Sequence, residues 1–148
     1  MSVLLTNLNP SGNSKSLTVE DMRIKRFEDI EAWQLARELT RKVYGLTKKA
    51  EFAHDFGLKR QIQDAAGSSM HNIAEGFDSE TNHEFVRFLR YAKRSCTEVQ
   101  SELYMALDQQ YITKAEFQDA YDHTGRTRAT IRGFIKYLLS YEQSRQKK

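Results

Sequence analysis

The residue types that most often catalyse reactions or bind metals are few and scattered in this 148-residue sequence. They are four histidines and one cysteine: His54, His71, His83, His123 and Cys96. No HExxH, CxxC, GxSxG or glycine-rich phosphate loop accompanies them. His71 and Glu75 can share one helical face, but two ligands do not complete a metal site, and an ion pair explains the spacing as well. Cys96 lies in an apolar stripe with no base nearby, so we expect a buried, inert thiol. We therefore expect no enzyme, no metal and no cofactor.

The segment NIAEG, Asn72 to Gly76, joins an amide, a carboxylate and a glycine, and so invites a catalytic interpretation. A structural role explains it better. Ile73 and Ala74 can be buried while Asn72 and Glu75 bond nearby backbone at a helix end, and Gly76 lets the chain turn. We interpret Asn72, Glu75 and Gly76 as a structural motif.

Positive charge is arranged in two rows, although the formal net charge is only +3. The first row is Arg87, Arg90, Lys93 and Arg94, and the second is Arg128, Arg132 and Lys136. Such rows suit contact with the phosphates of RNA or DNA. Because nothing resembles a recognition helix or a base-stacking platform, we expect sequence-independent binding. Glu84, Glu98 and Glu102 interleave with the first row, so a merely solvated helix surface remains an alternative.

The elements that must carry these rows are long helices, because the only proline is Pro10. Apolar periodicity predicts a first helix over about 27–49 and a second over about 56–75, with Asp55 as its N-cap and Gly76 as its stop. Thr81 with Glu84, and Thr113 with Glu116, form capping boxes that open two more helices. The expected fold is an all-α, antiparallel, up-and-down four-helix bundle.

A second apolar face is predicted on the first helix. Ile30, Trp33 and Tyr44 fall on a side of the helical wheel separate from the core stripe. Such a face usually meets a second partner, so these residues are predicted to form an oligomer interface. For Trp33, packing within the bundle is the alternative. Trp33→Ala is then expected to weaken assembly more than it weakens the bundle.

The chain divides into a polar, turn-rich segment, residues 1–22, predicted to be a flexible tail, and one bundle domain, residues 23–148. No apolar run approaches the roughly 18 residues of a membrane span. The first ten residues lack a basic start and an apolar segment of secretory length, and one cysteine fits a reducing compartment. We expect a cytoplasmic protein that makes no contact with membrane.

Two long motifs carry a resemblance that covers roughly residues 26–141. They are NIAEG, and the following EF-x-x-FL-x-x-A-x-x-S-x-x-E run that begins at Glu84. Together with FEDIEAW near the start, they resemble the bacterial four-helix bundle proteins first named for intervening sequences of 23S ribosomal RNA genes. The resemblance implies a homo-oligomer, typically a pentamer around a central channel, with no enzymatic activity. A distant relative is the accessory variability protein of diversity-generating retroelements, a basic pentamer that binds nucleic acid and partners a reverse transcriptase.

Two departures from the family pattern lower the local positive charge. Asp64 stands where relatives usually have arginine, and Ser79 and Glu80 occupy a region where another arginine is common. Two functions stay open. The first is a non-enzymatic oligomeric accessory protein that binds nucleic acid through basic helix faces, as a partner of a reverse transcriptase or of ribosomal RNA. The second is a protein-interaction scaffold without nucleic-acid contact.

Overall fold

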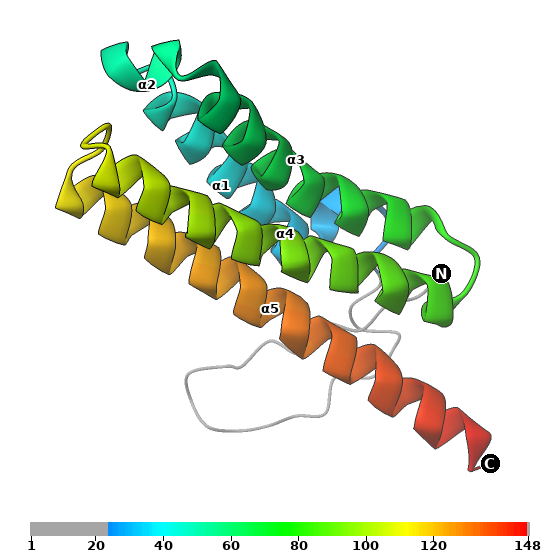
Figure 1. Ribbon diagram of the computed structural model, residues 1–148. Coiled ribbons are helices and arrows are strands. Elements are labelled where there is room, and N and C mark those ends of the chain that lie inside the picture. Colours follow the sequence, from blue (N-terminus) through cyan, green and yellow to red (C-terminus); the bar gives the residue numbers. More distant parts are fainter. Residues whose placement is uncertain (1–23, 148) are drawn as a thin grey trace.

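The computed structural model describes residues 24–147, and every regular element in that range is a helix (Figure 1). The elements are η1 (Phe27–Asp29), α1 (Glu31–Leu46), α2 (Ala50–His54), α3 (Phe56–Asp78), α4 (Asn82–Asp108) and α5 (Lys114–Gln146). The predicted tail, residues 1–22, lies outside the described residues. None of these helices combines the length and the apolar character that crossing a membrane requires.

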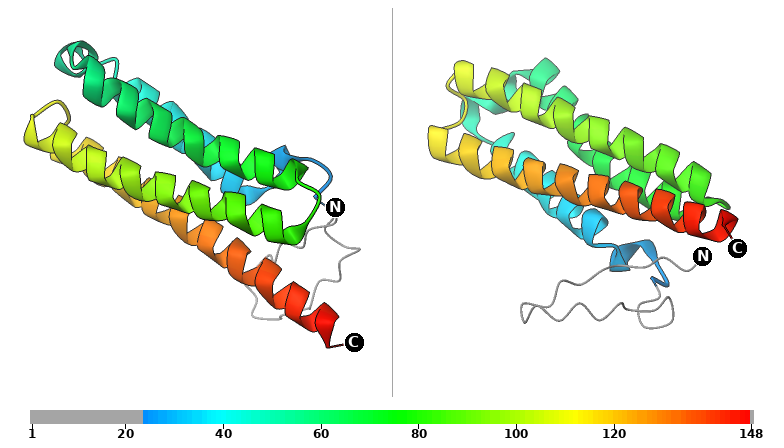
Figure 2. Two further views of the ribbon diagram at one scale, coloured as in Figure 1. Left: turned by 45° about the vertical axis from the view of Figure 1, so that its right-hand side comes forward. Right: turned by 90° about the horizontal axis from the view of Figure 1, so that it is seen from below.

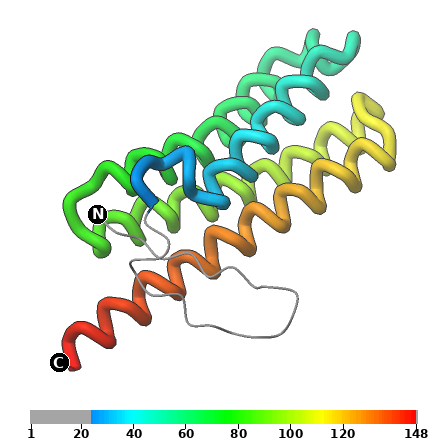
Figure 3. The backbone as a smooth tube through the Cα atoms, turned by 180° about the vertical axis from the view of Figure 1, so that it is seen from behind, coloured from blue at the N-terminus to red at the C-terminus, as the bar shows by residue number. Residues whose placement is uncertain are grey.

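Four long helices form the bundle, and each runs opposite to the one before it (Figures 1 and 2). α3 packs against α1 and α4, and α5 packs against α4 and α1. Figure 3 shows the chain from behind, with α1 lying next to α5. The four helices therefore close around a shared core, and the predicted all-α bundle is confirmed, with the short α2 added between α1 and α3.

The helix starts follow the predicted capping chemistry. The Asp55 carboxylate accepts a backbone N–H bond at the start of α3. At the start of α5, the Thr113 hydroxyl accepts the Glu116 N–H at 3.1 Å, and the Glu116 carboxylate accepts the Thr113 N–H at 2.9 Å, which completes a capping box. At α4, the Thr81 hydroxyl accepts the Glu84 N–H at 3.1 Å, which is one half of the predicted box.

The predicted first helix, 27–49, is wrong at both ends. The chain forms the separate turn η1, becomes extended at Ile30 (φ −77°, ψ 120°) and begins α1 only at Glu31. The helix then ends at Leu46. The extended residue places the Ile30 side chain in the core, where it is fully buried. Burial of this side chain, rather than helical periodicity, sets the start of α1.

The predicted stop at Gly76 is also wrong, because α3 continues through it to Asp78. Gly76 is buried where α3 crosses α4. A Cβ atom at this position would lie 2.9 Å from the Phe88 Cβ and 3.3 Å from the Phe85 carbonyl oxygen, closer than folded proteins allow. The glycine therefore permits close helix packing rather than a turn.

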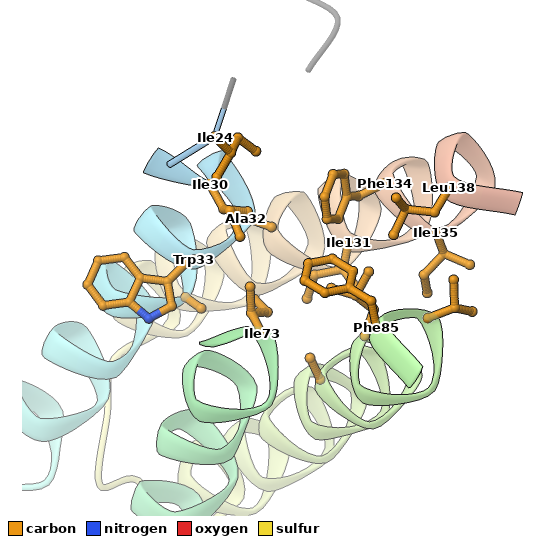
Figure 4. Close-up of a cluster of buried hydrophobic side chains, with 14 of the residues drawn as sticks. Ile24, Ile30, Ala32, Trp33, Ile73, Phe85, Ile131, Phe134, Ile135 and Leu138 are labelled. Carbon is orange, nitrogen blue, oxygen red and sulfur yellow. The ribbon is translucent and has the colours of Figure 1, made fainter. Parts of the chain in front are cut away.

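The core has two apolar clusters, one toward each end of the bundle. Figure 4 shows the cluster around Phe85, which includes Ile30 and Trp33, Ile73 of α3 and Ile131 of α5. The other cluster continues toward α2 and includes Phe52. These clusters hold the amphipathic helices together, because burying each large apolar side chain contributes roughly 1.5–3 kcal/mol to the stability of the fold.

Polar side chains also join every neighbouring pair of helices. One such bond for each pair is Thr40 Oγ1 to the Ala66 carbonyl (3.0 Å), Ser95 Oγ to Ser68 Oγ (3.1 Å), Arg128 Nε to Thr97 Oγ1 (3.2 Å) and His123 Nε2 to the Leu35 carbonyl (2.9 Å). His123 is buried, so its ring donates through Nε2 to that carbonyl.

Candidate nucleic-acid interface

The first basic row lies on the outer face of α4. Arg87, Arg90 and Arg94 are exposed, and Lys93 is half-buried on the side that faces α5. Arg87 Nε donates to Tyr91 Oη at 3.3 Å, and this bond raises the pKa of Arg87. The row therefore presents protonated groups to solvent along about two turns of helix.

The second row lies on α5, next to the first. Arg128 Nε donates to Thr97 Oγ1 of α4 at 3.2 Å, so these two residues lie level with each other on the two helices. Because α4 and α5 are antiparallel, four residues forward from Arg128 reach Arg132, and four residues back from Thr97 reach Lys93 (Figure 1). One helical turn further along, Lys136 of α5 lies about level with Arg90 of α4. The two predicted rows are thus combined in one strip, which we call the α4–α5 basic strip.

Most cations of this strip have no carboxylate partner in the described part of the chain. Of the seven residues in the two rows, only Arg87 is ion-paired, to Glu84 Oε1 at 3.5 Å. The interleaved Glu98 and Glu102 instead line the groove between α3 and α4. The positive charge of the strip is therefore not neutralised within residues 24–147.

Tyr91 lies between Arg87 and Arg94 on α4 and was missed from the sequence. Its side chain is 37% exposed, and the guanidinium carbons of Arg87 and Arg94 lie 5.8 and 5.7 Å from its ring centroid. The signal is the spacing R-x-x-x-Y-x-x-R, because positions i−4 and i+3 flank one residue on a helix surface. The expectation of no base-stacking platform did not take this ring into account.

An acidic groove lies between α3 and α4, with a volume of about 580 Å³. Its polar lining consists of the carboxylates of Asp64, Glu98 and Glu102 and the hydroxyls of Ser68, Ser95 and Ser101, beside Gln61. Burial, and then the neighbouring Glu98 and Asp64, raise the pKa of Glu102 to about 7. Its Oε2 atom is buried and has no hydrogen-bond partner among the described residues.

The predicted oligomer-interface residues do not form a shared outer face. Ile30 is fully buried and Trp33 is only 9% exposed, and both belong to the core of the bundle. Tyr44 alone is exposed, at 45%. The prediction of a separate stripe treated Ile30 as helical, although its backbone is extended. Trp33 instead packs against Phe27 of η1, with the two ring centroids 5.0 Å apart.

The NIAEG residues have different roles from one another. Asn72 Nδ2 donates to the Ser68 carbonyl at 2.8 Å and to Ser68 Oγ at 2.9 Å, as expected for a residue that bonds nearby groups. Ser68 in turn bonds Ser95 of α4, so Asn72 supports the contact between two helices. Gly76 allows their close approach. Glu75 is exposed, and its structural role stays a prediction.

The reactive residue types are not gathered into a site in the described range. Within residues 24–147, no three His, Cys, Asp or Glu side chains are placed to hold a metal ion. Cys96 is fully buried, as predicted, and burial raises the pKa of its thiol to about 12. His71 and Glu75 both lie exposed on α3. That folding needs no metal stays a prediction.

The fold and the basic strip place the chain in the class of small helical-bundle proteins. It belongs to the 23S rRNA-intervening sequence protein family, whose model matches residues 28–133. The match covers α1, α2, α3 and α4 in full and α5 up to residue 133, so it includes Arg128 and Arg132 of the second basic row.

A solved structure has the same fold. It is the crystal structure of a protein of unknown function from the S23 ribosomal protein family of Bacteroides thetaiotaomicron. The TM-score is 0.67 at 19% sequence identity, and the alignment covers 71% of this chain and 98% of that chain. No curated protein sequence matches significantly. At this identity the likeness shows the architecture alone.

Proposed function

We propose that this protein is a non-enzymatic accessory protein that binds nucleic acid through the α4–α5 basic strip. The observation that carries the proposal is the Arg128–Thr97 bond, which combines the cations of two helices in one surface. The family description, which names an intervening sequence of 23S rRNA, supports an RNA-related role. Affinity comes from phosphate contacts, because exposed guanidinium and ammonium groups release counterions when they neutralise phosphates.

One subunit carries a formal net charge of only +3, so a single strip binds weakly. We propose that the chain acts as a homo-oligomer, with a pentameric ring as the expected form, which repeats the strip on every subunit. Repetition makes each further contact intramolecular and raises the overall affinity by avidity. Light scattering of the purified chain measures this directly, and a monomer at micromolar concentration contradicts it.

Titration of labelled RNA and DNA at about 50 and 200 mM salt tests the binding. We expect the affinity of the wild type to fall on the order of tenfold or more over this range. The test variant is Arg87→Glu, Arg90→Glu and Arg94→Glu. Its matched control is Arg41→Glu, Lys48→Glu and Arg60→Glu, which reverses three exposed cations outside the strip.

Both triple variants change the charge of three residues by two units each, so both take the net charge from +3 to −3. Only the variant with Arg87, Arg90 and Arg94 reversed is expected to lose affinity for nucleic acid and to show a strongly reduced salt dependence. Equal losses in the two variants would show that overall charge, rather than the strip, sets binding. No binding by the wild type at low salt would end the proposal.

A second candidate function follows from the acidic groove between α3 and α4. Asp64, Glu98 and Glu102 give it the charge that suits a basic protein segment. In this alternative the chain is a protein-interaction scaffold that makes no contact with nucleic acid. Glu98→Lys then abolishes partner binding, whereas the Arg87, Arg90 and Arg94 reversals leave partner binding intact.

A further inference from the structure

Tyr91 has a solvent exposure that the fold does not require. It belongs to neither apolar cluster, and its nearest aromatic neighbour is Phe88, whose ring centroid lies 6.3 Å away in an edge contact. Tyr104, another exposed tyrosine of α4, is different because it packs against Phe117 of α5 at 4.8 Å. The ring of Tyr91 is therefore held on the helix surface without serving the core.

Two guanidinium groups lie over this ring and add to its stacked surface. Arg87 comes from one turn before Tyr91 and Arg94 from one turn after it, at 5.8 and 5.7 Å from the ring centroid. Among residues 24–147, Tyr91 is the aromatic residue with two guanidinium groups over its ring. The bond from Arg87 Nε to Tyr91 Oη restrains one of them.

This combination is chemically specific. Aromatic rings and guanidinium planes both stack on nucleobases, and guanidinium groups also bind phosphates. A base can stack only when its face is free, as it is in an unpaired nucleotide but not inside a duplex. A solvated row of arginines that binds phosphate alone does not make this distinction.

We infer that Arg87, Tyr91 and Arg94 form a stacking site for an unpaired nucleobase, so that the protein prefers single-stranded to double-stranded nucleic acid. This inference rests on the proposed function and adds the form of nucleic acid that the strip selects. The base stacks on the Tyr91 ring or continues the stack beyond a guanidinium group, while Arg90 and the α5 cations contact the adjoining phosphates. No base edge is read, so the sequence of the strand matters little.

The test is a competition titration with the full-length chain. Single-stranded RNA and DNA of one unstructured sequence, about 20 nucleotides long, are compared with the matching duplexes at constant salt. We expect tighter binding of the single strands. Tyr91→Ala should lower single-strand affinity about tenfold, change duplex affinity little and leave the salt slope unchanged, because the ring carries no charge.

Two further variants separate stacking from folding defects. Tyr91→Phe keeps the ring and should retain the preference for single strands. Tyr44→Ala removes a tyrosine of similar exposure from α1 and should have no effect on binding. In Tyr91→Trp, single strands but not duplexes should quench the exposed indole.

The outcomes distinguish this inference from the function on which it rests. If the wild type binds single strands and duplexes equally, or if Tyr91→Ala leaves their affinity ratio unchanged, the stacking site is refuted while phosphate binding by the strip stands. If the wild type binds neither form at low salt, the proposed function fails and the stacking site fails with it.

Discussion

Gly76 of α3 and Phe88 of α4 lie so close that a Cβ atom on residue 76 would be 2.9 Å from the Phe88 Cβ. The obstructing atom is attached directly to the backbone of α4, so it cannot move away by a rotamer change. The two helices can keep their spacing here only with glycine at position 76.

Gly76→Ala should therefore destabilise the protein, although alanine favours helix. Overpacking costs about 1–3 kcal/mol and the gain in helix propensity is about 1 kcal/mol, so we expect a net loss of up to about 2 kcal/mol. Urea denaturation measures it. Gly133→Ala is the matched control, because its Cβ meets nothing within 4 Å, and it should stabilise the protein by about 0.5–1 kcal/mol. Equal stabilisation in both variants would contradict the role given to Gly76.

Trp33→Ala should unfold the protomer rather than only disrupt assembly, which reverses the expectation from the sequence. The Trp33 side chain is packed in the core against Phe27, so truncation leaves a large cavity and costs about 3–5 kcal/mol. Tyr44→Ala removes a half-exposed ring and should change the unfolding free energy by less than about 0.5 kcal/mol. Thermal unfolding of the two variants measures these losses of stability. A larger loss in Tyr44→Ala than in Trp33→Ala would contradict the prediction.

Glu102 should make stability depend on pH. Its pKa is raised from the ordinary 4.5 to about 7 in the folded protein, so the native state keeps a proton that the unfolded chain releases between these values. The contribution of Glu102 to the unfolding free energy is largest below pH 4.5, falls as the pH rises and is lost above about 7. Relative to Glu102→Gln, the wild type should lose about 1 kcal/mol between pH 5 and 8, allowing for partial solvent screening.

The measurement is chemical denaturation of wild type and Glu102→Gln at several pH values. Glu75→Gln, on the exposed surface of α3, is the control and should follow the wild type. Parallel pH curves for wild type and Glu102→Gln would show that the groove does not hold a protonated carboxyl group.

Cys96 should be unreactive in the folded protein. The thiol is fully buried, and its pKa of about 12 leaves almost no thiolate at neutral pH. A disulfide reagent should therefore label it only as fast as the protein unfolds, and within seconds in denaturant. Rapid labelling of the native chain would indicate an opening of the core near Cys96.

Features set by neighbouring residues in the chain were predictable from the sequence. The capping box of Thr113 and Glu116 spans three residues, and the N-cap role of Asp55 is equally local. The burial of Cys96 followed from the apolar period of one helix. These features need no knowledge of what lies across the bundle.

Features set by the packing of one helix on another were not predictable. Gly76 has the same sequence context as a helix stop, and only Phe88 across the interface gives it another role. Ile30 continues a helical apolar pattern but is extended because the core takes its side chain. The groove around Glu102 depends on which residues of α3 lie opposite α4, and a single sequence does not fix that register. Tyr91 is the exception, since the Arg87–Tyr91–Arg94 spacing is visible in the sequence but was missed.

The hydrogen bonds between neighbouring helices also select the handedness of the bundle. Four antiparallel helices can follow one another clockwise or anticlockwise around the axis, and the same apolar stripes fill the centre in either arrangement. The flanks of the helices differ, however, because reversal would turn Ser68 away from Ser95 and His123 away from the Leu35 carbonyl. Each buried polar group left without a partner costs about 1–3 kcal/mol. The mirror topology is therefore disfavoured by side chains at the edges of the core, and not by the apolar stripes themselves.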